Sequence, residues 1–138
     1  VLELGTGLYS TPLLHYLCVP NNRRLVSVEN DINWLMQIGQ FECALHKFIF
    51  TEDWDVPELE QAWDVVFVDQ FPAEQRRKTV ERFANLARFI VVHDTNGRQD
   101  RHYHLRELWS SFKYVYHYGV FFPQTTVASN FEPIGAIC

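Results

Sequence analysis

The sequence has few cysteines and no long apolar segment. Its three cysteines, Cys18, Cys43 and Cys138, are widely separated and form no CxxC pair, which argues against a disulfide framework and against a zinc ribbon. No apolar run approaches the roughly 20 residues that span a bilayer, and no signal-peptide pattern opens the chain. We therefore expect a cytoplasmic protein with no membrane partner.

Basic charge is also scarce. Twelve Lys and Arg stand against 17 Asp and Glu, for a formal net charge of -5, so the chain has no broad positive field for a nucleic-acid backbone. The local cluster of Arg76, Arg77 and Lys78 is interpreted as the solvated face of a helix. We expect no nucleic-acid partner.

The length and the apolar content are those of one globular domain. The chain has 138 residues, of which 47% are hydrophobic, and this is enough to bury one core. The opening residues VLEL already read as a buried strand. We therefore expect residues 1–138 to form a single domain that lacks its usual N-terminal segment.

Short β-rich runs alternate with helical patterns along the chain. Apolar runs that end in polar residues or glycines predict strands, and apolar residues at helical spacing predict helices. This alternation indicates an α/β protein with a Rossmann-like, mainly parallel sheet flanked by helices, and with an antiparallel C-terminal edge. The expected strands are residues 1–4, 25–30, 47–50, 63–70, 88–96, 113–120 and 125–130, and the clearest helices are residues 31–40, 73–87 and 104–112.

Polar side chains or glycines follow each of the first five strands. Ligands of such a sheet bind beyond the carboxyl ends of its strands, and a carboxylate at the end of a buried strand is costly unless a partner satisfies it. Glycines let a ligand approach the backbone closely because they have no Cβ. The residues at these five ends are Glu3, Gly5 and Gly7; Glu29; Glu52, Asp53 and Trp54; Asp69; and His93, Asp94 and Thr95.

These strand ends carry a resemblance to a known family. VLELGTG followed by VSVEN, TEDW, VVFVD and IVVHDTN resembles, over essentially the whole chain, the class I S-adenosylmethionine-dependent methyltransferases, which have a Rossmann-like fold. The fifth strand, ending in His-Asp, is most similar to methyltransferases of the small-molecule type. The resemblance implies methyl transfer from S-adenosyl-L-methionine to a small-molecule acceptor, with an oxygen as the first candidate.

The resemblance also implies which residues bind the cofactor. Glu3 would hold the methionine ammonium directly or through water, and Glu29 would accept both ribose hydroxyls. Asp53 would take the adenine amino group with Trp54 against the ring, and Asp69 would lie near the transferring methyl. The implied cofactor-binding set is Glu3, Gly5, Thr6, Gly7, Glu29, Asn30, Asp53, Trp54 and Asp69.

The catalytic candidates are Asp69, His93 and Asp94. Because S-adenosylmethionine already activates its methyl group, the protein needs only to align the acceptor and, where required, to remove a proton. His93 is the slightly preferred general base, since imidazole titrates near neutral pH. Alternatively, Asp69, Asp94 and Asn96 would supply oxygen ligands for Mg²⁺ or Mn²⁺. A role of His93 and Asp94 as caps of the following loop also stays open.

Two other functions stay open on the sequence. An NAD-binding Rossmann domain is one, because Gly5, Gly7 and Ser10 come close to GxGxxG, although Glu3 places a carboxylate where that motif has an apolar residue. A non-catalytic relic or scaffolding domain that retains a nucleoside pocket is the other. The oligomeric state is equally open, and residues 125–130 are the expected exposed edge of the sheet.

Overall fold

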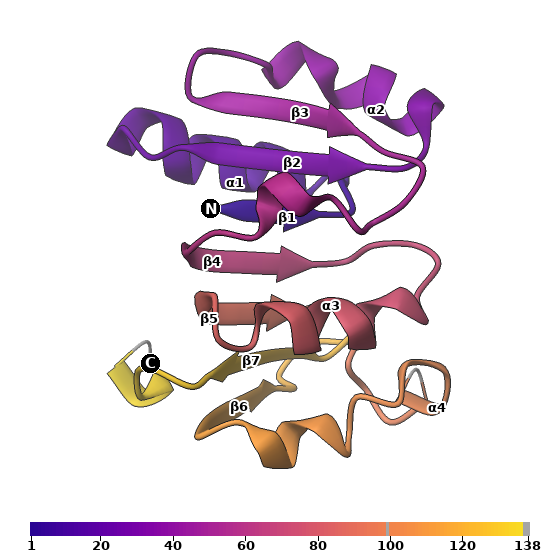
Figure 1. Cartoon of the computed structure of the whole chain (residues 1–138), viewed down its shortest axis with the longest axis vertical. Helices are drawn as coiled ribbons and strands as arrows, with labels where there is room; N and C mark the ends of the chain where they lie inside the picture. Colours follow the sequence, from indigo (N-terminus) through magenta and orange to yellow (C-terminus); the bar gives the residue numbers. More distant parts are fainter. Residues whose placement is uncertain (99, 137–138) are drawn as a thin grey trace.

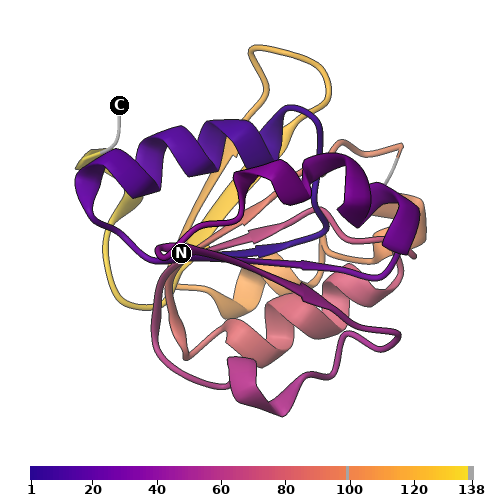
Figure 2. The same cartoon turned by 90° about the horizontal axis from the view of Figure 1, so that it is seen from above.

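A seven-stranded sheet lies between two layers of helices in the computed structural model, which describes residues 1–98 and 100–136 (Figure 1). The strand order is β3-β2-β1-β4-β5-β7-β6; the first five strands pair in parallel and the last two are antiparallel. Figure 2 shows α1 and α2 on one face of the sheet and α3 on the other. The predicted α/β, Rossmann-like architecture is confirmed.

The elements follow the expected alternation. The strands are β1 (Leu2–Leu4), β2 (Leu25–Glu29), β3 (His46–Phe50), β4 (Trp63–Val68), β5 (Ala87–Val92), β6 (Tyr114–Tyr118) and β7 (Thr125–Ser129). The α-helices are α1 (Ser10–Cys18), α2 (Ile32–Ile38), α3 (Gln75–Phe83) and α4 (Asp100–Tyr103).

The central strands are buried on both faces. Val66, Val68, Ile90 and Val92 of β4 and β5 are fully buried, as expected for parallel strands that are covered by helices. The parallel register brings the carboxyl ends of β1, β2, β4 and β5 to one edge of the sheet. That edge is where the sequence places its polar strand endings.

The helix expected at residues 104–112 does not form as predicted. The short α4 ends at Tyr103, and His104 has a φ of 52°, a left-handed conformation that interrupts a right-handed helix. Only a 3-10 turn over Leu108–Ser111 follows. Leu105 and Phe112 are nevertheless buried, so the apolar spacing correctly indicated which side chains face the core.

The expected exposed edge at residues 125–130 is also wrong. β7 lies between β5 and β6, so β6 is the edge strand. The side chains explain this order: Thr126 and Ala128 of β7 are fully buried, whereas Tyr114, Tyr116 and Tyr118 of β6 are exposed. The strand with small side chains therefore takes the interior position, and the strand with large amphipathic rings faces solvent.

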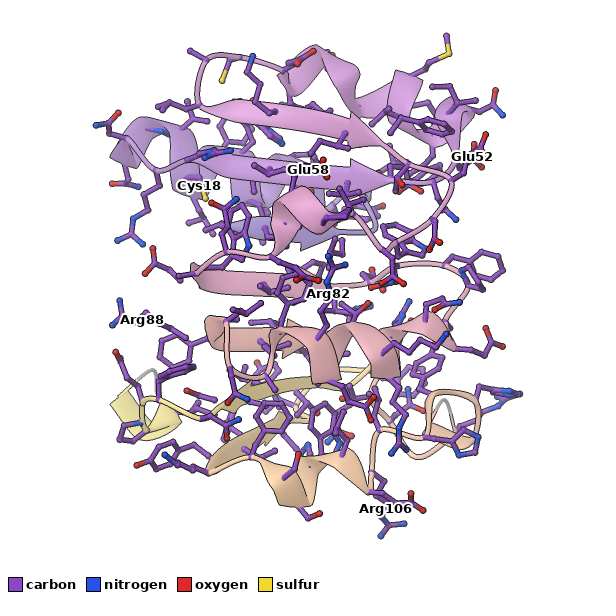
Figure 3. The ribbon with its side chains drawn as sticks, viewed as in Figure 1. Cys18, Glu52, Glu58, Arg82, Arg88 and Arg106 are labelled. Atoms are coloured by element: carbon purple, nitrogen blue, oxygen red, sulfur yellow. The ribbon has the colours of Figure 1, made fainter. Side chains whose placement is uncertain are left out.

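Helix α3 is shorter than the expected 73–87 and is fixed to the loop between β3 and β4. Arg82 of α3 donates from Nη1 to the Trp54 carbonyl oxygen at 2.9 Å and from Nη2 to the Val56 carbonyl oxygen at 2.5 Å (Figure 3). Val80 and Phe83 are buried against the sheet, as their helical spacing predicts.

No helix in the described part of the chain is long and apolar enough to cross a membrane. Cys18 and Cys43 are free thiols, and Cys138 lies outside the described residues.

Candidate functional site

The turn after β1 requires glycine at its first position. Gly5 has a φ of +85°, and a Cβ there would lie 2.5 to 2.6 Å from backbone atoms of Asp69 and Gln70. Both the conformation and the space exclude a side chain. Glycine at this position lets the end of β1 pass against the end of β4.

Glu29, at the end of β2, is buried and fully hydrogen-bonded. Its Oε2 accepts hydrogen bonds from the backbone N–H and the hydroxyl of Thr6, at 2.8 and 2.7 Å. Its Oε1 accepts from the backbone N–H groups of Asn30 and Asp31, at 2.8 and 3.1 Å. These four donors offset the desolvation of the carboxylate and fix its orientation.

A pocket of about 300 Å³ adjoins this carboxylate. It combines the Gly5 turn, the end of β2 and the end of β4, which come from three separate parts of the chain. Its lining residues are Gly5, Thr6, Glu29, Asn30, Asp31, Trp34, Asp69 and Phe71. The structure therefore brings five of the predicted cofactor-binding residues together around one cavity.

Asp53 and Trp54 do not line this pocket. Asp53 is exposed, whereas Trp54 is buried and donates from its indole N–H to the Phe71 carbonyl oxygen at 3.1 Å. The Asn30 amide donates to the same carbonyl at 2.9 Å. The aromatic rings in the pocket are those of Trp34 and Phe71, which the sequence analysis did not select because no strand-end position marks them.

Glu3 lies beneath the turn and has no exposed surface. The Ser27 hydroxyl donates to its Oε2 at 2.5 Å, and the Thr11 hydroxyl lies 3.0 and 3.1 Å from its two oxygens. Burial raises the pKa of Glu3 to about 7, although the hydrogen bond from Ser27 acts in the opposite direction. Gly7 is connected to the same network, since its N–H donates to the Thr11 hydroxyl oxygen at 2.9 Å.

Two histidines extend the Glu3 network toward the surface. His46 is fully buried; its Nε2 lies 2.9 Å from the Ser27 hydroxyl and its Nδ1 lies 3.0 Å from Nδ1 of His15. Burial lowers the pKa of His46 to about 4, so the ring is neutral at pH 7. When Glu3 is ionised, Ser27 donates its only proton to it, so Nε2 of His46 donates to Ser27 and Nδ1 of His46 accepts from His15.

Asp69, His93 and Asp94 form a second group, here called the acid–histidine cluster. Nδ1 of His93 lies 3.4 Å from an oxygen of Asp69 and 3.5 Å from an oxygen of Asp94. The interaction with the Asp69 carboxylate raises the pKa of His93, and the nearby Asp94 charge adds to the effect, while burial opposes it. Asp94 has a φ of 59°, an uncommon backbone conformation of the kind that concentrates at functional sites.

The cluster has the donor types of a metal centre. One ligand atom from each of its three residues lies within 4.8 Å of the others. Asn96 is half-buried, and its side-chain oxygen accepts from the Arg98 N–H at 3.2 Å.

Arg76 is the main site residue that the sequence analysis misjudged. It was interpreted as part of a solvated face, but its side chain is only 6% exposed and its Nη2 lies 2.8 Å from Oδ1 of Asp69. The signal was available in the spacing: Arg76 precedes Val80 by four residues and Phe83 by seven, which places it on the buried stripe of the helix.

No family model and no curated protein matches the sequence. Among solved structures, a provisionally named O-methyltransferase from Klebsiella pneumoniae has a TM-score of 0.71 and 15% sequence identity, over 95% of this chain and 72% of that chain. The O-methyltransferase TomG from Streptomyces achromogenes, involved in tomaymycin synthesis and solved in complex with SAM, has a TM-score of 0.70 and 19% identity over the same shares. Human methyltransferase-like protein 13, solved with SAH, has a TM-score of 0.67 and 17% identity over 96% of this chain and 72% of that chain.

The strand order, the glycine turn after β1 and these likenesses agree with the resemblance seen in the sequence. The chain has the fold of the class I S-adenosylmethionine-dependent methyltransferases.

Proposed function

We propose that residues 1–138 form a domain that binds S-adenosyl-L-methionine and transfers its methyl group to a small-molecule acceptor, with an oxygen as the first candidate. The observation that carries the proposal is the buried carboxylate of Glu29, held by Thr6 at a pocket of about 300 Å³ that Asp69 also lines. Two of the structures with this fold were solved with the cofactor or its demethylated product.

In this proposal the cofactor enters the pocket with its ribose toward Glu29. A vicinal diol suits a carboxylate that has two acceptor oxygens. Four protein donors already bond to Glu29, so the Thr6 hydroxyl must rotate away, and the ribose must share the Glu29 oxygens with the backbone N–H groups. The rings of Trp34 and Phe71 are placed to contact the adenine.

The methionine ammonium would lie near the Gly5–Gly7 turn, above Glu3. Glu3 has no exposed surface, so its carboxylate would act through Thr11 or through water rather than by direct contact. The Asp53 carboxylate is exposed on the loop after β3, where it would reach the adenine amino group only from outside the cavity.

Transfer requires little covalent chemistry from the protein. When bound, S-adenosylmethionine would supply an activated methyl group to the acceptor oxygen and leave as its demethylated thioether, and the acceptor proton would pass to a base. Asp69 lines the pocket and lies beside His93, so neutral His93 is the proposed proton acceptor, with Asp69 and Asp94 stabilising the resulting imidazolium. The net charge of -5 favours a small acceptor over a nucleic acid.

A metal-dependent version of the reaction is the alternative. Mg²⁺ or Mn²⁺ held by Asp69, Asp94 and Asn96 would lower the pKa of an acceptor hydroxyl. The donor types fit such an ion, but the Asp69 carboxylate is already paired with Arg76.

Calorimetric titration tests the proposal with S-adenosylmethionine, S-adenosylhomocysteine and NAD. We expect the first two to bind, and Glu29→Gln to weaken both by on the order of 10- to 100-fold, as loss of charge-assisted hydrogen bonds predicts. Glu58→Gln is the matched control, because Glu58 is exposed on the loop between β3 and β4 (Figure 3). Thermal unfolding of both variants checks that the fold is intact.

Three outcomes separate the candidate functions. Binding of NAD alone would overturn the assignment in favour of a dinucleotide-binding domain. Cofactor binding that Glu29→Gln leaves unchanged would move the cofactor out of this pocket. Binding without methyl transfer to any acceptor in a screen with labelled cofactor would support the non-catalytic relic.

A further inference from the structure

Arg76 is held on every side by the ends of β4 and β5. Its Nε donates to the Gln70 carbonyl oxygen at 3.0 Å, its Nη1 to the His93 carbonyl oxygen at 3.0 Å, and its Nη2 to the Asp69 carbonyl oxygen at 3.1 Å. The ring of Tyr103 covers the guanidinium at 4.8 Å. The three nitrogens are thus fixed by backbone groups of two strands, and the charge cannot swing away from the acid–histidine cluster.

The position of Arg76 is unfavourable for the helix alone. It lies in the first turn of α3, where the positive end of the helix dipole repels a cation. It is also nearly fully buried, and a buried charge is costly unless it is paired and hydrogen-bonded. The ion pair with Asp69 and the three hydrogen bonds to carbonyl oxygens offset both costs. A buried arginine is therefore stable at this position only because the acid–histidine cluster and the strand ends are there to pair with it.

The same oxygen of Asp69 serves two neighbours. Oδ1 lies 2.8 Å from Nη2 of Arg76 and is also the oxygen that lies 3.4 Å from Nδ1 of His93. An ion bound between Oδ1 of Asp69 and Nδ1 of His93 would take this oxygen as a ligand. It would then lie next to a guanidinium that does not lose its proton in proteins. Nη1 of Arg76 lies 4.0 Å from Asp94 as well, so both carboxylates face the resident cation.

From these contacts we propose that Arg76 is the fixed cation of the acid–histidine cluster: a positioning residue that aligns Asp69 and His93 and excludes a divalent metal ion from between them. The proposal rests on the proposed function, in which this cluster is the site of proton removal. It assigns the protein to metal-independent methyl transfer. After His93 has accepted the acceptor proton, the negative charges of Asp69 and Asp94 are balanced by the positive charges of Arg76 and the His93 imidazolium.

Binding of Mn²⁺, followed by electron paramagnetic resonance of the full chain, tests the proposal. We expect no saturable binding to the wild type in the millimolar range and at least tenfold tighter binding to Arg76→Met. Arg77→Met is the matched control, since Arg77 lies on the same helix but pairs with the exposed acids Glu81 and Glu107. It should bind Mn²⁺ no better than the wild type.

Two results would overturn the proposal. One is saturable submillimolar binding to the wild type that Asp69→Asn abolishes, and the other is folded Arg76→Met that binds no more tightly than the wild type. If Arg76→Met does not fold, the NMR resonances of the Arg76 side-chain N–H groups in the wild type are the deciding measurement. They should be resolved at neutral pH and unaffected by about 1 mM Mn²⁺, which is on the order of the Kd of a weak site. Selective broadening of these resonances by Mn²⁺ would refute exclusion of the metal ion. Failure of the proposed function is seen separately, in the cofactor titration.

Discussion

Replacing Glu3 by glutamine removes the most strongly perturbed carboxylate described in the site. Glutamine has nearly the same shape and keeps an oxygen that accepts from Ser27, but it carries no charge that must be desolvated. Glu3 is fully buried beneath the Gly5 turn, and its pKa is raised from 4.5 to about 7. We therefore expect Glu3→Gln to stabilise the protein without cofactor at alkaline pH.

The sign follows from proton binding. Between pH 4.5 and 7 the folded protein keeps the Glu3 proton while the unfolded chain loses it, so the contribution of Glu3 to the free energy of unfolding falls as pH rises through this window. Below pH 4.5 and above pH 7 the contribution of Glu3 to the free energy of unfolding does not change with pH. The full rise in pKa corresponds to about 3 kcal/mol, so Glu3→Gln should match the wild type near pH 4.5 and exceed it by up to about 3 kcal/mol at pH 8.

Urea unfolding of the wild type and of Glu3→Gln at half-unit pH steps measures this difference. The difference between the two curves isolates Glu3, because all other titrating groups, including His46 with its pKa lowered to about 4, are shared by the two proteins. Glu58→Gln, at an exposed site, should give a flat difference. A variant less stable than the wild type at pH 8 would show that Glu3 is ionised at little cost in the folded protein, and the burial argument would fail.

Three further substitutions test the fold. Gly5→Ala should lower the free energy of unfolding by about 3 kcal/mol or more, because the alanine would have a strained φ and its Cβ would overlap the backbone of Asp69 and Gln70. Gly39→Ala should instead raise the free energy of unfolding by about 0.5 kcal/mol, because nothing lies within 4 Å of the new Cβ. If both alanine variants unfold at the same urea concentration, the close approach at Gly5 is not real. Arg88→Ala should leave the urea midpoint unchanged, since Arg88 projects into solvent (Figure 3) and its pairs with Asp64 and Glu132 are exposed; a clear loss of stability would contradict this.

The sequence is informative where one local signal decides the outcome. Alternating strand and helix patterns predicted the parallel sheet, and the glycines after β1 indicated a close approach to the backbone, because they have no Cβ. Glu29 and Asp69 could be placed at one cavity because parallel strands bring their carboxyl ends to the same edge.

The remaining features depend on contacts between distant segments. The apolar spacing of residues 104–112 is compatible with a helix, and nothing local announces the left-handed φ at His104. Phe71 enters the pocket only because Asn30 and Trp54 hold its carbonyl from other parts of the chain. The burial of Arg76 was predictable from its helical spacing to Val80 and Phe83, although a charged side chain is usually exposed.

Arg76 and Arg82 of α3 have a mechanical consequence, since both are hydrogen-bonded to backbone carbonyls of other segments. At one end of the helix Arg76 is bonded to the ends of β4 and β5, and at the other Arg82 is bonded to the loop that carries Trp54. This nine-residue helix thus connects the ends of β4 and β5 to the loop between β3 and β4. Local unfolding of α3 would therefore release the ends of β4 and β5 and the loop that carries Trp54 in a single cooperative event.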